Sequence, residues 1–213
     1  MSKINSNSTL FLIDGSTFIF RAYFAMYKAS QNRGSGFTRS DGTPTGALMA
    51  FCNMMWKIIT NGIDGVQPSH IAVIFDTKEK TFRSNIYPLY KANRDAPPED
   101  LIPQFALIHR AVEAFNIKCI SQIGYEADDL IATYSKIASE RDAQTIIISG
   151  DKDLMQLINN NVRMYDPMPG KEKFIDSNGV YDKFGVTPDK VVDVQALAGD
   201  STDNIPGVPG IGI

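Results

Sequence analysis

Nine acidic residues follow short apolar runs, lie where a helical pattern begins or fall in a turn-rich stretch. Asp14 and Asp76, for example, each end a run rich in Ile, Val and Phe that is typical of a buried strand. The carboxyl ends of parallel strands line one crevice of an open sheet, so we expect most of these carboxylates to converge there. The nine residues are Asp14, Asp76, Glu126, Asp128, Asp129, Asp151, Asp153, Asp200 and Asp203.

Each acid also has an ordinary structural explanation. Asp14 and Asp151 are suited to capping a helix, and the acids at 126–129 would favour a helix N-terminus through its dipole. Asp200 and Asp203 are common turn formers. In extended chain, residues two apart point the same way, which would aim Glu126 with Asp128, and Asp151 with Asp153, at a shared space.

Considered together, the nine carboxylates would repel one another strongly unless a cation lies among them. Oxygen ligands without a His or Cys cluster favour Mg²⁺ or Mn²⁺ over zinc. Two such ions about 4 Å apart suit phosphodiester hydrolysis, one activating water and the other stabilising the leaving oxygen. We interpret the two histidines, His70 and His109, as structural, and the sequence offers no Ser–His or Cys–His pairing for acyl transfer.

A basic segment follows Asp76, although the chain as a whole has a net charge of −3. Residues 77–95 contain five basic side chains and only two acidic ones. Pairs spaced three apart would share one face of a helix, and Tyr87 and Tyr90 lie between them. Aromatic and basic groups together suit single-stranded nucleic acid, whereas the alternative is a solvated surface helix. The basic residues are Lys78, Lys80, Arg83, Lys91 and Arg94.

Strand-like runs alternate with helical patterns along the chain, which predicts an α/β fold with a mainly parallel central sheet flanked by helices. The expected strands are 9–13, 70–75, 117–121 and 145–148, and the expected helices are 45–60, 99–115, 126–140 and one or two within 180–198. Residues 30–43 are predicted to be a loop. Residues 77–97 could be a mobile helix or a loop.

The composition is that of an ordinary globular protein. The chain has 213 residues, of which 43% are hydrophobic and 21% charged, enough for a sizeable core. No apolar run approaches the roughly 18–20 residues of a membrane-spanning helix, and the N-terminus lacks a signal-type stretch. The two cysteines make no disulfide framework, which suggests reduced thiols in a cytoplasmic protein.

The order and spacing of seven motifs resemble the N-terminal 5′-nuclease domains of bacterial DNA polymerases I, within the flap endonuclease superfamily. The resemblance runs from about residue 9 to the end of the chain. The motifs are Leu12-Ile-Asp-Gly-Ser16 with Arg21-Ala-Tyr23, Val73-Ile-Phe-Asp76, Thr81-Phe-Arg83, Tyr90-Lys91, Gly124-Tyr-Glu-Ala-Asp-Asp129, Gly150-Asp-Lys-Asp153 and Gly199-Asp-Ser-Thr-Asp-Asn-Ile-Pro-Gly207.

This resemblance implies a two-metal, structure-specific nuclease that removes 5′ flaps and RNA primers. The first metal would be held mainly by Asp14, Asp76, Glu126, Asp128 and Asp129, and the second by Asp151, Asp153, Asp200 and Asp203. The segment near 77–97 would form a helical arch over the 5′ strand. The implied catalytic cations are Lys91, Arg94, Arg83 and Arg21. The implied substrate-binding residues are Tyr90, which would stack on a base, Arg83, Arg94 and Lys80.

The resemblance also predicts the organisation of the chain. Residues 1–198 would form the catalytic core, and residues 199–213 a metal-binding turn and the start of a helix–hairpin–helix, which in the family binds duplex phosphates and K⁺. The chain ends at Ile213, before the second helix of that motif. The resemblance therefore implies a C-terminally truncated nuclease domain that is monomeric and associated with the nucleoid. Its implied partners are DNA with a 5′ flap or nick and RNA primer–DNA hybrids, and no membrane is expected among them.

Two other functions are compatible with the acidic residues. A PIN-type ribonuclease shares a sheet with clustered carboxylates, but such enzymes are usually shorter. A DNA-binding fragment that is inactive through truncation could also retain the metal site. The long basic segment and the Gly-Asp-Ser-Thr-Asp-Asn turn favour the 5′ nuclease.

Overall fold

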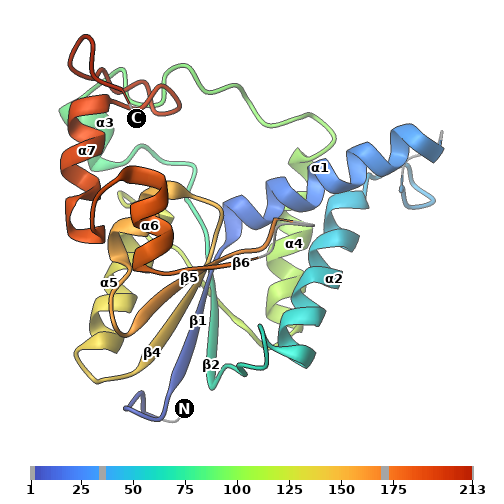
Figure 1. The fold of residues 1–213 in the computed structure, drawn as a ribbon. Helices are drawn as coiled ribbons and strands as arrows, with labels where there is room; N and C mark the ends of the chain where they lie inside the picture. The colour runs from blue at the N-terminus through green and yellow to red at the C-terminus, as the bar shows by residue number, and fades with distance from the viewer. Residues whose placement is uncertain (1–2, 34–36, 169–172, 213) are drawn as a thin grey trace.

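A six-stranded sheet forms the centre of the computed structural model, which describes residues 3–33, 37–168 and 173–212. The strands are β1 (Thr9–Asp14), β2 (His70–Ile74), β3 (Lys118–Ile120), β4 (Gln144–Ile148), β5 (Val162–Asp166) and β6 (Lys173–Ile175), in the order β3-β2-β1-β4-β5-β6. All neighbours are parallel except β5 and β6 (Figure 1). The predicted mainly parallel α/β sheet is confirmed.

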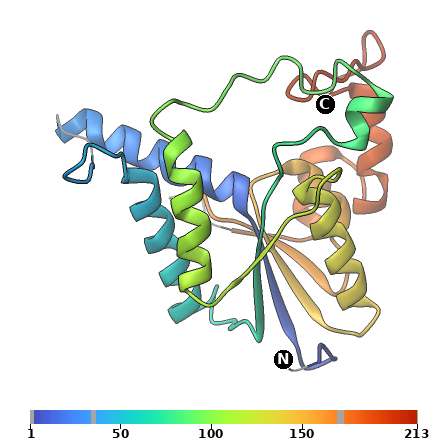
Figure 2. The ribbon, with the colours of Figure 1, turned by 180° about the vertical axis from the view of Figure 1, so that it is seen from behind.

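Helices cover both faces of this sheet (Figures 1 and 2). One face carries α1 (Gly15–Arg33), α2 (Gly46–Asn61) and α4 (Ile102–Ala114), and the other carries α5 (Ala127–Ser139), α6 (Ser177–Phe184) and α7 (Val191–Ala198). In β1, Phe11 and Ile13 pack into the hydrophobic core between the sheet and α1, α2 and α4. Leu10 and Leu12 pack into the core on the opposite face, with α5 and α6. Successive side chains of a strand point to opposite faces, so a strand buried on both faces is apolar throughout.

Most predicted elements are present within a few residues of their expected bounds. The sequence analysis missed the edge strands β5 and β6, and it did not delimit α1, which begins directly after Asp14. The predicted loop over 30–43 is wrong at its start, because α1 continues to Arg33, whereas residues 34–36 lie outside the described chain.

The basic segment is not one continuous helix. It contains α3 (Phe82–Ile86), which ends before Pro88, because a residue that precedes proline is disfavoured in helical conformation. Lys91 has a positive φ of 56° and lies in a turn. The prediction that the cations share helix faces at a spacing of three is therefore wrong, both for Lys91 with Arg94 and for Lys80 with Arg83.

The end of the described chain forms turns around Gly210, whose φ is 85°. Up to Gly212 it contains no helix that would begin a helix–hairpin–helix, so the K⁺ site implied there stays a prediction. Two short 3₁₀ helices, η1 (Lys152–Leu157) and η2 (Pro188–Lys190), connect the later elements. None of the helices in the described ranges is both long and apolar enough to cross a membrane.

Candidate active site

All nine acidic residues line three adjoining cavities at the carboxyl ends of the parallel strands. The cavities measure about 390, 420 and 610 Å³, and Asp128 contributes to each of them. Asp14 reaches this edge from the end of β1, Asp76 from just beyond β2, and Asp151 from just beyond β4. The expected convergence of carboxylates at one sheet edge is therefore observed.

Asp14 and Asp76 connect the sheet to the helices that start beside it. Asp14 is buried and accepts hydrogen bonds from the Thr17 backbone N–H at 3.1 Å and from Ser149 Oγ at 2.8 Å. Asp76 accepts from Ser16 Oγ at 2.7 Å and from the Ala127 N–H at 2.8 Å. Burial raises the pKa of Asp14 despite these hydrogen bonds.

Asp128 and Asp153 are repelled by neighbouring acids. Burial, followed by repulsion from Asp14, Asp151 and Asp76, raises the pKa of Asp128 well above its ordinary value. Burial and the nearby Asp151 likewise raise the pKa of Asp153. Neither carboxylate forms an ion pair with a basic side chain in the described parts of the chain. A bound cation would therefore stabilise both groups.

Asp129 differs from its neighbour because it already has strong partners. Its two oxygens accept from Arg83 Nη1 at 2.7 Å and Nη2 at 2.8 Å, a bidentate pair. Oδ2 also accepts from the Glu126 N–H at 2.9 Å, as the third helical residue does in a capping box at the start of α5. The hydrogen bonds from Arg83 lower the pKa of Asp129 most.

Adjacent substitutions at these two acids should have opposite effects on folding. We expect Asp129→Ala to lower the free energy of unfolding by about 2 kcal/mol, because a helix cap and a charged hydrogen-bonded pair are lost. Asp128→Ala should leave the free energy of unfolding unchanged or raise it, because it removes an uncompensated charge. Urea unfolding in EDTA, followed by circular dichroism, measures both. An equal decrease in the free energy of unfolding of the two variants would contradict the conclusion that Asp129 is compensated and Asp128 is not.

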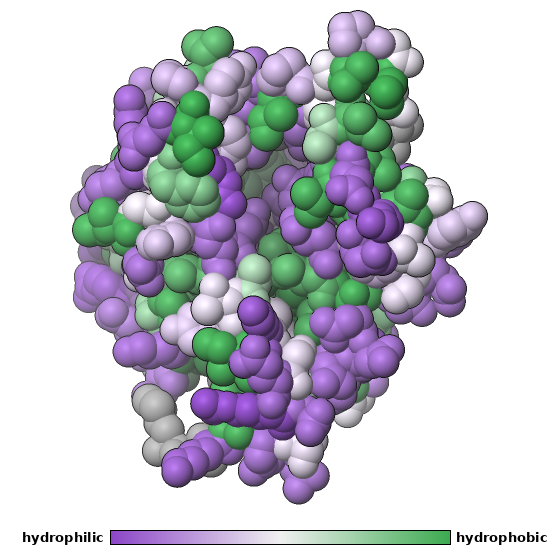
Figure 3. All heavy atoms as spheres, turned by 90° about the vertical axis from the view of Figure 1, so that its left-hand side faces the viewer, coloured by the Kyte–Doolittle hydropathy of each residue, from purple (hydrophilic) through white to green (hydrophobic). Residues whose placement is uncertain are grey.

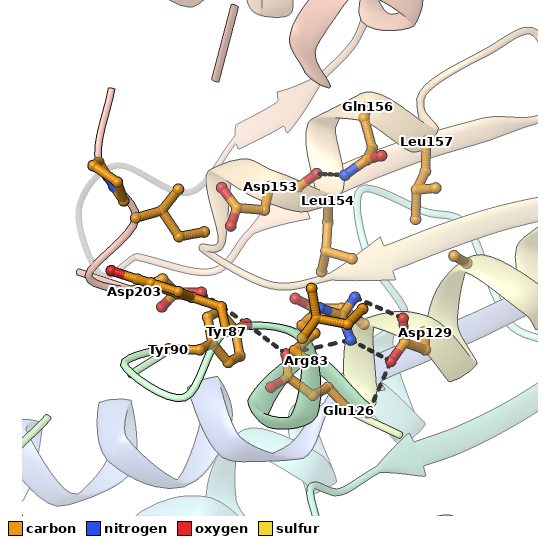
Figure 4. Close-up of a pocket in the computed structure, with 15 residues that line it drawn as sticks. Arg83, Tyr87, Tyr90, Glu126, Asp129, Asp153, Leu154, Gln156, Leu157 and Asp203 are labelled. Carbon is orange, nitrogen blue, oxygen red and sulfur yellow. Dashed lines mark hydrogen bonds and ion pairs between the residues drawn. The ribbon is translucent and has the colours of Figure 1, made fainter. Parts of the chain in front are cut away.

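Side chains of residues 87–94 contact Glu126 and Asp203. Figure 4 shows Tyr90 of this segment beside Glu126 and Asp203. Lys91 Nζ lies 2.9 Å from Glu126 Oε2 and 3.8 Å from Asp203 Oδ2. The Tyr90 hydroxyl donates to the same two oxygens at 2.9 and 3.0 Å, and burial together with these carboxylates raises its pKa. Arg94 pairs with Asp203. The segment therefore neutralises acids that the sequence analysis assigned to metals.

Some predicted residues are placed differently from expectation. Arg21 lines two of the cavities but forms its ion pair with Asp166, at 3.0 Å. Lys80 is exposed and lines none of the three cavities. The sequence analysis missed Lys152, whose Nζ lies 2.8 Å from Asp200 Oδ2. Its position inside the Gly150–Asp153 motif was the signal that could have identified it.

The donor set fits divalent metal ions only after some rearrangement. Among residues 3–33, 37–168 and 173–212, no three His, Cys, Asp or Glu side chains are arranged to hold a metal ion. Basic side chains engage Glu126, Asp129, Asp200 and Asp203. The other five acids have no such ion pair among the described residues and supply the hard oxygen atoms that Mg²⁺ and Mn²⁺ prefer. These five are Asp14, Asp76, Asp128, Asp151 and Asp153.

The largest of the three cavities, of 610 Å³, has mixed walls. Ile86, Leu154 and Ile205 provide apolar surface beside the acids and beside Tyr87 and Tyr90. Figure 3 shows the face that carries α3, α5 and α7, where hydrophobic and hydrophilic groups border a hollow. The other two cavities are lined mainly by charged and polar groups. One part of the site therefore suits a planar, weakly polar group, and the other places carboxylates and basic side chains side by side.

Residues 9–185 match the model of the family described as 5′-3′ exonuclease, N-terminal resolvase-like domain. The chain is 36% identical to a 5′-3′ exonuclease of Bacillus subtilis, over 97% of this chain and 68% of that protein. It is 50% identical to DNA polymerase I of Rhizobium leguminosarum, over 99% of this chain but only 20% of that protein. The chain thus spans about a fifth of the length of this curated polymerase relative.

Solved structures share the fold. The crystal structure of the bacteriophage T5 D15 flap endonuclease, a pseudo-enzyme-product complex with DNA and metal ions, superposes with a TM-score of 0.73 at 22% identity. The match covers 96% of this chain and 71% of that one. The catalytic core of Rad2 in complex with DNA substrate aligns with a TM-score of 0.57 at 17% identity, over 96% and 58% of the two chains.

Proposed function

The chain belongs to the family of 5′-3′ exonucleases with an N-terminal resolvase-like domain, and we propose that it is the catalytic core of a metal-dependent nuclease that cleaves DNA at 5′ flaps. The proposed substrates include nicked duplexes and RNA primers paired with DNA. The observation that supports this best is the sheet edge where nine carboxylates face one basic segment. A role in replication and repair, as a monomer beside the nucleoid in the cytoplasm, belongs to the same proposal.

We propose that Asp14, Asp76, Asp128, Asp151 and Asp153 provide the first ligands of Mg²⁺ or Mn²⁺. Glu126, Asp129, Asp200 and Asp203 would join them once their present ion pairs are exchanged. In phosphodiester hydrolysis, bound divalent ions activate a water and stabilise the leaving oxygen. The absence of ion pairs at these five acids in the described chain supports this order, and at Asp128 and Asp153 burial and repulsion from neighbouring acids favour uptake of a cation.

The basic side chains would bind the phosphates. Lys91, Arg94 and Arg21 line the 390 Å³ cavity, and Lys152 and Lys183 also line the 420 Å³ cavity. Their charges would bind non-bridging phosphate oxygens and stabilise the charge that develops there during cleavage. Lys80, exposed beside α3, would contact the DNA backbone farther from the acids.

Arg83 and Tyr90 have more specific proposed roles. Arg83 is held by both oxygens of Asp129, so it would reach a phosphate only after that pair opens. Tyr90 lies in the 610 Å³ cavity with the apolar side chains Ile86, Leu154 and Ile205. Because bases stack on aromatic rings whatever their sequence, this cavity suits an unpaired base next to the scissile phosphate.

One cleavage experiment distinguishes the proposed function from the two alternatives. The protein is incubated in Mg²⁺ with a fluorescent 5′-flap duplex, a single-stranded RNA and a blunt duplex. The proposal predicts that the flap is cut fastest and that EDTA abolishes cleavage. Preferential cutting of the RNA would indicate a PIN-type ribonuclease, and flap binding without any cleavage would indicate an inactive DNA-binding fragment.

Replacing Mg²⁺ by Ca²⁺ should separate binding from cleavage. Ca²⁺ accepts the same oxygen ligands but is larger and geometrically looser. We therefore expect flap binding, measured by fluorescence anisotropy, to persist in Ca²⁺ while the cleavage rate falls to background. Cleavage in Ca²⁺ at the rate seen in Mg²⁺ would rule out a mechanism that depends on the tighter geometry of Mg²⁺.

A further inference from the structure

Residues 87–94, here named the strap, cross the acidic site without a helix to stiffen them. Their internal backbone hydrogen bonds are those of successive turns, from Tyr90 N–H to Tyr87 O, Ala92 N–H to Leu89 O and Arg94 N–H to Lys91 O. These bonds measure 2.9, 3.1 and 3.2 Å. Turns of this kind leave the position of the strap to be determined by what it contacts.

Three hydrogen bonds that involve no carboxylate attach the strap to residues 199–205, here named the acidic turn. Asn93 Nδ2 donates to Ser201 O at 2.7 Å, and Asn204 Nδ2 donates to Leu89 O at 2.8 Å. Between them, the Lys91 N–H donates to Asp203 O at 2.9 Å. The two amide side chains thus cross in opposite directions on either side of Lys91.

The ion pairs of the strap cannot hold it during the proposed reaction. Lys91 and Arg94 pair with Glu126 and Asp203. In the proposed reaction metal ions would bind these carboxylates, and substrate phosphates would bind the two basic side chains. The amide hydrogen bonds use backbone carbonyls instead, so they are compatible with a metal-bound and substrate-bound site. They remain when the ion pairs are exchanged.

We propose that Asn93 and Asn204 are positioning residues, a latch that keeps the strap, and therefore Lys91, over the acidic turn once metal ions have displaced its ion pairs. This inference rests on the proposed function. Neither asparagine lines any of the three cavities, so the latch acts through the strap rather than on the substrate. Asn204 has a positive φ of 58°, a conformation that asparagine tolerates better than most residues.

The test uses the double variant Asn93→Ala with Asn204→Gly, because glycine accepts the positive φ at position 204 without strain. The matched control is Asn85→Ala, which removes an exposed amide from α3 just before the strap. Trypsin cleavage after Lys91 and Arg94, followed by mass spectrometry, reports how often the strap detaches. This readout requires no nuclease activity.

Loss of each exposed hydrogen bond should raise the detached population about 5-fold, and loss of both about 25-fold. In Mg²⁺, where the ion pairs are exchanged, we expect trypsin to cut the double variant about 25-fold faster than wild type. In EDTA the ion pairs also hold the strap, so wild type and the double variant should both be cut more slowly than in Mg²⁺, with a similar ratio between them. The Asn85→Ala control should match wild type in both conditions.

Cleavage of the 5′ flap gives the second readout. The single-turnover rate of the double variant at saturating enzyme should fall at least 10-fold while flap affinity changes less than 3-fold, because the phosphate-binding cations are retained. Equal tryptic rates for the double variant, the control and wild type in Mg²⁺ would overturn the latch. If wild type cleaves no DNA but the tryptic difference persists, the latch stands and the proposed function fails.

Discussion

Lys91→Ala should lower the single-turnover rate of 5′-flap cleavage about 10²–10³-fold. Lys91 Nζ lies within 4 Å of both Glu126 and Asp203, so its charge is already at the acidic edge where a scissile phosphate would bind. Removal of one electrostatic contact to developing charge typically has an effect of that size. Flap affinity should change less, because Arg94 and the other cations still provide the phosphate contacts.

The same substitution should have little effect on folding. When Lys91 is removed, Glu126 still accepts from the Tyr90 hydroxyl and Asp203 still pairs with Arg94, so neither carboxylate is left without a partner. We expect the melting temperature to change by less than about 3 °C. Lys78→Ala, which removes an exposed lysine of the same segment, serves as the control for charge alone.

Three possible roles of Lys91 are distinguished by measuring the cleavage rate, the flap affinity and the melting temperature of Lys91→Ala. A solvated surface lysine would leave all three unchanged, as Lys78→Ala should. A residue that only binds substrate would weaken affinity but keep the rate at saturating enzyme. Either result would contradict a role for Lys91 in stabilising the reaction.

Millimolar Mg²⁺ or Mn²⁺ should raise the melting temperature by about 5–10 °C relative to EDTA. A ligand present at about 100 times its dissociation constant, and bound only by the folded state, stabilises that state by about 2.7 kcal/mol. In a protein of this size each kcal/mol shifts the melting temperature by about 2–4 °C. Burial and repulsion at Asp128 and Asp153 provide the physical reason for cation uptake.

The variant Asp151→Asn with Asp153→Asn should lose most of this gain. In EDTA its melting temperature should equal or exceed that of wild type, because the substitutions remove two negative charges from the repelling group. The pair Glu113→Gln with Glu140→Gln, at exposed positions on α4 and at the end of α5, removes two negative charges away from the three cavities and controls for nonspecific effects. A wild-type melting temperature indifferent to Mg²⁺, Mn²⁺ and EDTA would show that no metal binds here.

The basic segment shows where reasoning from local spacing failed. The spacing of Lys91 and Arg94 suggested one helix face, but the structure places them in successive turns beyond Pro88. They still reach the same group of acids, because the strap is attached to a turn more than one hundred residues later, as the 109-residue separation of Arg94 and Asp203 illustrates. Local periodicity carries no information about a contact of that kind.

The sequence by itself determined the alternation of strands and helices and the membership of the acidic edge. A strand buried on both faces is continuously apolar, and its carboxyl end is the position of acids such as Asp14, Asp76 and Asp151. The other acids were identified from a helix start and from the motifs of the family resemblance. Only the tertiary structure decided which carboxylates are paired. Asp128 and Asp129 are adjacent in the chain, yet Arg83 from α3 compensates one and burial isolates the other. Charge compensation depends on distances of a few ångströms between elements remote in sequence, so it emerges only when the chain folds.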